Sequence, residues 1–388
     1  MKKIILIVTV IVLLGGIGSY FYVNNRVEEK DLKVPEEISS DDLFGKYYPQ
    51  AERKLKQMSL EEKVGQLFLV RYDASTSIKQ ITDYYAGGFV LFAKDFQNHT
   101  KESIKKELEA RQELSKIPLA LAVDEEGGYV TRVSRFPQFR SEKFKSNKEL
   151  FETGGYELVK AGEKEKAELL LGLGINLNLA PVADVSTDSN DYMYIRTFGR
   201  DAKETATFIA NIVRYNEEAG LSSCLKHFPG YGNNLDTHGG IAIDNRSYEN
   251  FVNNDFLPFK SGIEASVPAV LVSHNKAMAI DSKYPASLSK KVIAELRETL
   301  DFSGIIITDD LAMGAVLEYV NENVSATLAI NAGNDMIITS DYEKMYNEVL
   351  NGVSSGTIKV ETIDIAVRRI IAWKYAYGLC NFNSQSRQ

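Results

Sequence analysis

Short apolar runs, many of them rich in β-branched residues, recur along this chain and alternate with stretches that have a helical repeat. Several runs are almost continuously apolar, which is typical of parallel strands buried on both faces. The runs are Val64–Tyr72, Gly87–Ala93, Leu119–Asp124, Ile175–Asp184, Leu221–Phe228, Ala269–His274, Gly304–Asp310 and Asp335–Ser340. Between them, amphipathic helices are predicted over segments such as Lys101–Ser115, Glu204–Glu218 and Ile363–Lys374.

Strands that alternate with helices in this way predict an α/β fold with right-handed crossovers. Eight such units favour a single closed (β/α)₈ barrel of the TIM type. The alternative is an open, doubly wound sheet, which a G-x-G-x-x-G turn after the first strand would favour. No such turn follows the first predicted strand, so we expect the closed barrel.

The first residues of the chain have the pattern of a transmembrane helix. An uncharged apolar stretch, Ile4–Val23, follows Lys2 and Lys3, and its length matches the roughly 20 residues that a helix needs to cross a bilayer. Positive charge before such a stretch favours a cytoplasmic N-terminus. No A-x-A-like cleavage site is obvious after it. We therefore expect a membrane-anchored, extracytoplasmic protein, or a secreted one if the segment is cleaved.

These patterns divide the chain into four parts. Residues 1–25 form the anchor or signal segment, and the polar residues 26–42 form a stalk that carries the folded domain. Residues 43–380 form the predicted barrel. The polar tail, residues 381–388, is expected to be frayed.

Composition and charge narrow the classes of function. The 388 residues include 45 Lys and Arg against 53 Asp and Glu, which gives a net charge of −8. A net negative chain without a long basic cluster is not expected to bind nucleic acid. The two cysteines, Cys224 and Cys380, are too few for a disulfide scaffold, and Cys224 lies in a predicted core strand. We therefore expect free thiols in a folded, acidic domain.

Polar residues gather where the predicted strands end. They are Asp124-Glu125-Glu126, Asp184, Lys226-His227, Ser273-His274 and Asp309-Asp310. In a barrel of this kind the carboxyl ends of all strands meet on one face, where catalytic residues lie. A single aspartate at such an end can be a helix N-cap instead. Because five strands end in this way, we predict a functional site at this face.

The loop after the fifth predicted strand contains Asp236-Thr237-His238, with glycines on both sides. An aspartate two residues before a histidine can hold the imidazole by one ring nitrogen, which leaves the other nitrogen able to move a proton. The alternative is an Asx-turn followed by a surface histidine. The chain has only four histidines. Three of them, His227, His238 and His274, lie on or after the fifth and sixth strands, which favours the catalytic interpretation.

Four sequence motifs, taken together, are highly specific for one protein family. They are KHFPG followed by DTH (Lys226–Gly230 and Asp236–His238), DEEGGYVTR (Asp124–Arg132), IRTFG (Ile195–Gly199) and IITDDLAM (Ile306–Met313). With these motifs the chain resembles glycoside hydrolase family 3, and within it the β-N-acetylglucosaminidase branch. The resemblance extends from about residue 45 to residue 380 and implies a (β/α)₈ barrel. The chain departs from the family pattern at Tyr231, where histidine is usual.

The resemblance also implies an activity and the residues that carry it. Family members of this branch hydrolyse terminal β-linked N-acetylglucosamine with retention of configuration. The motif match places the nucleophile at Asp309 and the general acid/base at His238, oriented by Asp236. The residues that correspond to the sugar-binding positions are Asp124, Arg132, Arg196, Lys226 and His227. The resemblance implies no cofactor and no metal.

The implied mechanism is chemically consistent with these residue types. Retention of configuration requires a nucleophile on one side of the anomeric carbon and a proton donor on the other. A histidine with its ordinary pKa of about 6.5 can protonate the leaving oxygen and then activate water near neutral pH. The expected extracytoplasmic location makes peptidoglycan-derived glycans the predicted carbohydrate substrate.

Other functions are also compatible with the sequence. The same family includes β-glucosidases and other exo-glycosidases. A metal-dependent hydrolase is a second alternative, with the candidate ligands His227, His238, His274 and Asp309. An H-x-H pair at the end of an early strand, which would favour it, is missing. A carbohydrate-binding protein on a degenerate barrel would need neither Asp309 nor the Asp236–His238 pair, so their presence favours an enzyme.

Overall fold

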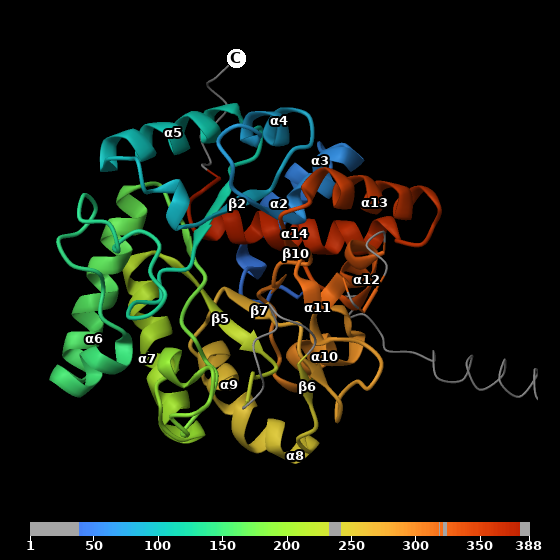
Figure 1. Cartoon of the computed structure of the whole chain (residues 1–388). Coiled ribbons are helices and arrows are strands. Elements are labelled where there is room, and N and C mark those ends of the chain that lie inside the picture. Colours follow the sequence, from blue (N-terminus) through green and yellow to red (C-terminus); the bar gives the residue numbers. More distant parts are fainter. Residues whose placement is uncertain (1–38, 233–241, 318, 321–323, 381–388) are drawn as a thin grey trace, which may run out of the picture. The chain divides into compact units, whose positions relative to one another are not determined.

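The computed structural model describes residues 39–380, with gaps at 233–241, 318 and 321–323. In this part of the chain, eight parallel strands form a closed barrel (Figure 1). The strands are β1 (Phe68–Arg71), β2 (Gly88–Leu91), β3 (Ala120–Val123), β4 (Leu177–Asn178), β5 (Ser222–Phe228), β7 (Ala269–Val272), β9 (Ile305–Thr308) and β10 (Met336–Thr339). Each strand is hydrogen-bonded to the next, and β10 pairs with β1, so the predicted (β/α)₈ barrel is confirmed.

Helices surround the barrel strands. The longer ones are α2 (Tyr48–Leu55), α3 (Leu60–Gln66), α5 (Lys101–Leu114), α6 (Asn147–Gly172), α7 (Ala202–Ala219), α9 (Phe256–Glu264), α12 (Ser325–Ala332), α13 (Tyr342–Ser354) and α14 (Val360–Ala376). The shorter ones are α4 (Ser77–Thr82), α8 (Tyr248–Asn250), α10 (Lys290–Ala294) and α11 (Gly314–Leu317), with the single turns η1 (Gly45–Tyr47), η2 (Ala93–Asp95), η3 (Tyr194–Arg196), η4 (Phe251–Asp255), η5 (Ala286–Leu288) and η6 (Glu295–Thr299). The three helices predicted from the sequence are present as α5, α7 and α14. Helix α7 packs between α6 and α9 (Figure 1).

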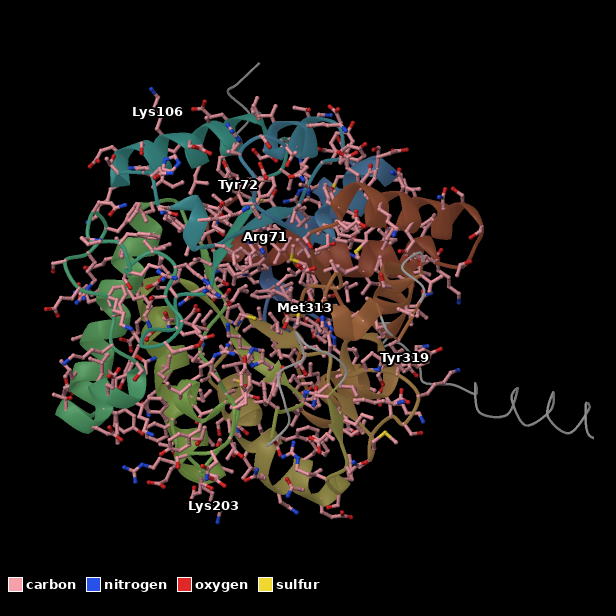
Figure 2. The ribbon with its side chains drawn as sticks, in the orientation of Figure 1. Arg71, Tyr72, Lys106, Lys203, Met313 and Tyr319 are labelled. Atoms are coloured by element: carbon pink, nitrogen blue, oxygen red, sulfur yellow. The ribbon has the colours of Figure 1, made fainter. Side chains whose placement is uncertain are left out.

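The barrel strands have the composition that burial on both faces requires. Every residue of β2, β3, β5, β7, β9 and β10 is buried, and side chains crowd the barrel and its contacts with the helices (Figure 2). At Gly88, a Cβ atom would lie 2.2 Å from the carbonyl oxygen of Ala120, so only glycine lets β2 approach β3 this closely. A packed interior of this kind holds the strand ends in fixed positions.

Two predicted strands differ from the observed ones by more than two residues at one end. The segment Val64–Tyr72 begins too early, because Val64–Gln66 is the end of helix α3. The segment Ile175–Asp184 is too long, because only Leu177–Asn178 pairs as β4. Pro181 has no N–H group to donate to a neighbouring strand. The residues after β4 therefore leave the barrel wall early and form part of the loops at its carboxyl end.

A second, two-stranded sheet lies outside the barrel. Strand β6 (Ile243–Asp244) pairs in parallel with β8 (Lys276–Ala277). Because β6 belongs to the long loop after β5 and β8 follows β7, this sheet ties two neighbouring loops together. The segment that contains Asp236 and His238 ends shortly before β6.

The predictions for the two ends of the chain fall outside the described residues. The predicted anchor lies within residues 1–25 and the predicted tail is residues 381–388, so both stay predictions. Among the helices that the structure describes, none has the length and apolar character needed to cross a bilayer. Both cysteines lie in the described part and are free, as expected, with Cys224 buried and Cys380 partly exposed.

Candidate active site

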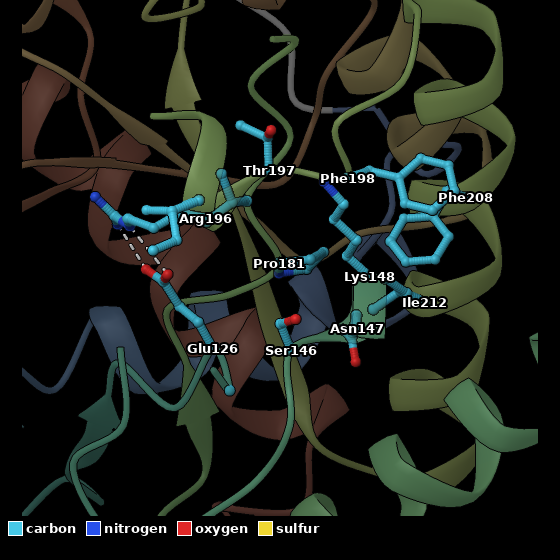
Figure 3. A pocket seen from close by; sticks show the side chains of 13 residues that line it. Glu126, Ser146, Asn147, Lys148, Pro181, Arg196, Thr197, Phe198, Phe208 and Ile212 are labelled. Atoms are coloured by element: carbon cyan, nitrogen blue, oxygen red, sulfur yellow. Dashed lines mark hydrogen bonds and ion pairs between the residues drawn. The ribbon is translucent and has the colours of Figure 1, made fainter. Parts of the chain in front are cut away.

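A network of ion pairs lies at the carboxyl ends of β3 and β5. Lys226, in β5, is its centre, because its Nζ lies 2.7 Å from Oδ1 of Asp124 and 2.7 Å from Oε1 of Glu126. Arg196 donates from Nε and Nη2 to the two carboxylate oxygens of Glu126, at 3.0 and 2.6 Å (Figure 3). Arg132 Nη2 is 3.7 Å from Oδ2 of Asp124. The structure therefore brings four of the predicted sugar-binding residues together.

The loop after β3 is folded around a buried carboxylate. Glu125 is fully buried, and its side chain accepts the backbone N–H groups of Arg132 and Val133, each at 2.7 Å. The hydroxyl of Ser134 donates to the same carboxylate. These bonds fix the loop, and the carboxylates on either side of Glu125 are thereby held against Lys226.

The network stays ionised because opposite charges lie close together. Burial alone would raise the pKa of Glu126, but Lys226 and Arg196 lower it to about 2. Burial also opposes the positive charge of Lys226 and of Arg196, but the nearby carboxylates outweigh this effect and raise the pKa of both. At neutral pH the site therefore offers charged N–H donors and carboxylate acceptors, which form strong hydrogen bonds with hydroxyl groups.

Asp184, which follows β4, holds His227 in one orientation. Its Oδ2 lies 2.8 Å from His227 Nδ1 and accepts the backbone N–H of His227 at 3.1 Å. Its Oδ1 accepts the backbone N–H of Tyr231 at 2.7 Å. Because a carboxylate only accepts, Nδ1 of His227 carries the hydrogen. Nε2 is then the ring nitrogen that faces Arg196, with a distance of 3.5 Å to Nη2.

Asp309 is the first residue after β9. Its backbone N–H donates to the last carbonyl of β7 at 2.9 Å, and its Oδ1 accepts the N–H of Asp310 at 2.8 Å. Burial would raise the pKa of Asp309, but the charges of His274, His227 and Lys226 lower it below its usual range. The carboxylate is therefore ionised at neutral pH, and it lies within electrostatic reach of the Lys226 network.

Two other residues at the strand ends support the chain around this carboxylate. His274 is fully buried, with Nε2 2.9 Å from the carbonyl oxygen of Asp310 and Nδ1 2.8 Å from Oγ of Ser287. A carbonyl oxygen only accepts, so Nε2 of His274 carries the hydrogen. The carboxylate of Asp310 accepts the N–H of Ala312 at 2.9 Å. The side chains of His274 and Asp310 therefore form hydrogen bonds within the protein.

The described residues give no support to the metal-dependent alternative. Among them, no group of three or more His, Cys, Asp or Glu residues is arranged to hold a metal ion. Both ring nitrogens of His274 have protein partners, and Asp184 holds Nδ1 of His227. The remaining histidine of that set, His238, lies outside the described residues.

The predicted acid/base pair also lies outside the described residues. Asp236 and His238 fall in the gap at 233–241. The structure therefore gives the positions of Asp309 and of the five sugar-binding candidates but not those of Asp236 and His238, and the roles of all these residues stay predictions.

Glu126 and Asp184 belong to the site, although the sequence motifs did not assign them a role. Glu126 joins Lys226 to Arg196, and Asp184 orients His227. A signal was present for both, because Glu126 follows a predicted strand and Asp184 is the last residue of another. The position of a carboxylate at a strand end does not reveal which side chain it contacts.

A cavity of about 30 Å³ lies next to the Glu126–Arg196 pair (Figure 3). Its lining includes Lys148, Phe198 and Asn147, whose buried Oδ1 has no hydrogen-bond partner among the described residues. The cavity has room for ordered water. The cavity is therefore next to the ion-pair network, and Glu126 and Arg196 belong to both.

Replacing Glu126 by glutamine is expected to lower the free energy of unfolding by up to about 3 kcal/mol at neutral pH. The pKa of this carboxyl is about 2 in the folded protein against an ordinary value of 4.5. The ionised form therefore stabilises the fold above pH 4.5, and this contribution is lost as the pH falls toward 2. Chemical denaturation of both proteins across this range would measure the effect.

The control for this prediction is Glu165→Gln. Glu165 forms an exposed ion pair with Arg140 at 2.8 Å, so its replacement should change stability by less than about 1 kcal/mol. A difference between wild type and Glu126→Gln that stays constant from pH 7 to acid would contradict the assigned ionisation of Glu126.

Comparison with known proteins places the chain in a family. It matches the glycosyl hydrolase family 3 N-terminal domain over residues 59–373. A beta-hexosaminidase of Hydrogenovibrio crunogenus is 30% identical over 290 residues, which cover 71% of this chain and 78% of that protein. Beta-hexosaminidase LpqI of Mycobacterium tuberculosis is 28% identical over 330 residues, which cover 82% of this chain and 83% of that protein.

The fold agrees with this placement. The structure of a glycoside hydrolase family 3 beta-N-acetylglucosaminidase from Paenibacillus sp. FPU-7 superposes with a TM-score of 0.77 at 28% identity. The superposition covers 85% of this chain and 65% of that chain, so this chain spans less than the full length of that protein. The family match includes the barrel strands from β1 to β10 and most of α14. The chain therefore belongs to glycosyl hydrolase family 3, and the protein is a glycoside hydrolase.

Proposed function

We propose that this glycoside hydrolase is a retaining β-N-acetylglucosaminidase, which removes terminal β-linked N-acetylglucosamine. The observation that carries the proposal is the position of Asp309, which follows β9 at the carboxyl end of the barrel, where Lys226 and His227 also lie, and whose pKa is lowered in part by these two residues. A nucleophile beside groups that bind hydroxyls is what a retaining mechanism needs on one side of the sugar. The relatives named beta-hexosaminidase and beta-N-acetylglucosaminidase support the choice of sugar.

In the proposed first step, Asp309 attacks the anomeric carbon. Its Oδ1 accepts a hydrogen bond from the N–H of Asp310, which helps to hold the carboxylate in place for the attack. As this bond forms, the bond from the anomeric carbon to the leaving oxygen breaks, and that oxygen takes a proton from His238. The lowered pKa of Asp309 keeps the nucleophile ionised.

In the proposed second step, water displaces the carboxylate of Asp309 from the anomeric carbon. His238 accepts a proton from the water, whose oxygen attacks the anomeric carbon while the bond to Asp309 breaks. Two inversions at the same carbon give net retention. His238 is therefore neutral in the covalent intermediate, and Asp236 stabilises the imidazolium form that is present before the first step and is restored by the second.

Recognition of the sugar is assigned to the ion-pair network. Lys226, Arg132 and Arg196 supply N–H donors, and Asp124 and Glu126 supply carboxylate acceptors. Because these groups already hold one another in place, the sugar ring can be fixed for in-line attack with little rearrangement of the protein. Nε2 of His227 supplies a further polar contact.

The proposal includes an extracytoplasmic location. It is supported by the apolar stretch Ile4–Val23, which follows two lysines at the start of the chain. A protein anchored there, or secreted after cleavage, would meet peptidoglycan-derived glycans, whose N-acetylglucosamine residues are β-linked.

The proposal is tested by a release assay with p-nitrophenyl sugars. We expect kcat/KM for the β-N-acetylglucosaminide to exceed that for the β-glucoside and the β-xyloside by about 10-fold or more, because polar groups built to bind the acetamido group lose their partner in the other two sugars. The first product detected by NMR should be the β anomer. A preference for the β-glucoside would assign the chain to the β-glucosidases instead.

Two further outcomes separate the remaining alternatives. Protein that binds N-acetylglucosamine but never releases p-nitrophenol would be a carbohydrate-binding protein. Activity that disappears in excess chelator and returns with added metal would indicate a metal-dependent hydrolase, whereas we expect unchanged activity in chelator.

A further inference from the structure

Arg246, in the loop after β6, lies between two buried carboxylates, those of Asp244 in β6 and Asp255 in η4. Its Nη2 is 2.7 Å from Oδ2 of Asp244, and its Nε is 3.0 Å from Oδ1 of the same residue. Its Nη1 is 2.8 Å from Oδ2 and 3.0 Å from Oδ1 of Asp255. The side chains of Asp244 and Asp255 are 1% and 0% exposed. We call these three residues the Arg246 clamp.

The clamp contacts the chain that leads into residues 233–241. Nη2 of Arg246 is 3.4 Å from the carbonyl oxygen of Gly230. A Cβ atom at Gly232 would lie 2.5 Å from Cζ of Arg246, and one at Gly230 would lie 2.3 Å from Oδ1 of Asp255. The φ angle is +119° at Gly230 and +56° at Gly232, and each of these angles by itself favours glycine. The backbone therefore rests directly on the Arg246–Asp255 pair.

The same clamp holds the chain that follows residues 233–241. Asp244 is part of β6, which pairs with β8. One residue before β6, the carbonyl oxygen of Ala242 accepts the N–H of Lys276 at 2.8 Å. The backbone N–H of Arg246 also donates to Oδ1 of Asp244, at 3.0 Å. One guanidinium thus joins the residues before the segment to the residues after it.

We infer that Arg246 is a positioning residue for the acid/base step. The segment between its contacts contains Asp236 and His238, so the inference rests on the proposed function. By fixing where this segment begins and ends, Arg246 restricts the positions from which the imidazole can give a proton to the leaving oxygen. The nucleophile Asp309 follows a different strand, β9, so its attack is affected much less.

Substrates that differ only in the leaving group test the inference. Arg246→Lys keeps the positive charge but cannot pair with two carboxylates at once. Phenol needs a proton to leave, whereas 2,4-dinitrophenol leaves readily as the anion. We expect kcat/KM of the variant to fall about 10- to 100-fold for the phenyl β-N-acetylglucosaminide and less than about threefold for the dinitrophenyl one. A partly unfolded population would lower both values equally.

A matched control and a second variant complete the design. Arg297 also pairs with a buried carboxylate, that of Asp335 at 2.6 Å, but it lies at the amino ends of β9 and β10, so Arg297→Lys should leave the ratio of the two kcat/KM values unchanged. Gly232→Ala pushes a methyl group onto the guanidinium without removing a charge. It should change the ratio in the same direction as Arg246→Lys, and it keeps the test available if that variant fails to fold.

His238→Ala is the reference for both variants. A ratio that changes strongly in His238→Ala but not in folded Arg246→Lys or Gly232→Ala would overturn the inference and leave the proposed function intact. Wild-type protein that releases neither phenol would overturn the proposed function, and the inference with it. If the ratio of the two kcat/KM values changes in the same direction in His238→Ala, Arg246→Lys and Gly232→Ala, the positioning role of Arg246 is supported.

Discussion

Replacing Asp309 by asparagine is expected to lower kcat by about 10⁴-fold or more, because the amide cannot form the covalent intermediate. The fold should be retained, because the asparagine oxygen can still accept the N–H of Asp310. The measurement is release of p-nitrophenol from the β-N-acetylglucosaminide, together with an unfolding curve that shows whether the variant is as stable as wild type.

Asp310→Asn is the matched control for this prediction. The carboxylate of Asp310 accepts the backbone N–H groups of Ala312 and Ser340 through one oxygen, and an amide oxygen can replace it. We expect less than about a 10-fold change in kcat. If Asp310→Asn were inactive and Asp309→Asn active, the nucleophile would have to be reassigned to the second aspartate.

Replacing His238 by alanine is expected to lower kcat/KM by about 10²- to 10⁴-fold for substrates with a poor leaving group. The reason is that the variant has no group to protonate the leaving oxygen. The loss should be much smaller with a dinitrophenyl leaving group. Kinetics with both substrates measure the effect, and equal losses on the two would contradict the role of His238 as general acid.

His99→Ala provides the comparison for loss of an imidazole elsewhere. His99 precedes α5, with Nδ1 3.1 Å from Oγ of Ser103 and Nε2 3.6 Å from a carboxylate oxygen of Glu107. Both partners lie on α5, so this replacement should leave both kcat/KM values within about twofold of wild type.

The barrel could be predicted from the sequence because its strands are buried on both faces. The run Ile305-Ile306-Ile307 in β9 pairs on one side with Ala269–Leu271 of β7, and neither strand has a solvent face that would require polar residues. Strands of this kind therefore appear in the sequence as continuous runs of apolar residues. Their number and order along the chain then leave few topologies to consider.

The ends of the strands were harder to predict, because apolar runs extend beyond the hydrogen-bonded residues. Val64 is buried, but it lies in α3 and not in β1. The start of that helix is marked by a capping box, in which Ser59 Oγ accepts from the N–H of Glu62 at 3.2 Å and Glu62 Oε2 accepts from the N–H of Ser59 at 3.0 Å. Hydrophobicity alone does not distinguish the end of this helix from the strand that follows.

The location of the site could be predicted, but its pairings could not. Three consecutive carboxylates, Asp124-Glu125-Glu126, follow β3. Glu125 binds backbone N–H groups of its own loop, whereas its two neighbours bind Lys226. Which carboxylate faces which group depends on how the loop folds back, and this is decided by contacts between residues far apart in the sequence.

Asp184 has a consequence for how this chain can change over evolutionary time. Its two oxygens bind the imidazole and the amide of His227 and the amide of Tyr231. A replacement at position 184 would leave three groups of a neighbouring strand end without their acceptor in a single mutation. We therefore expect this aspartate and the turn from residue 227 to residue 231 to be inherited, or lost, as one block.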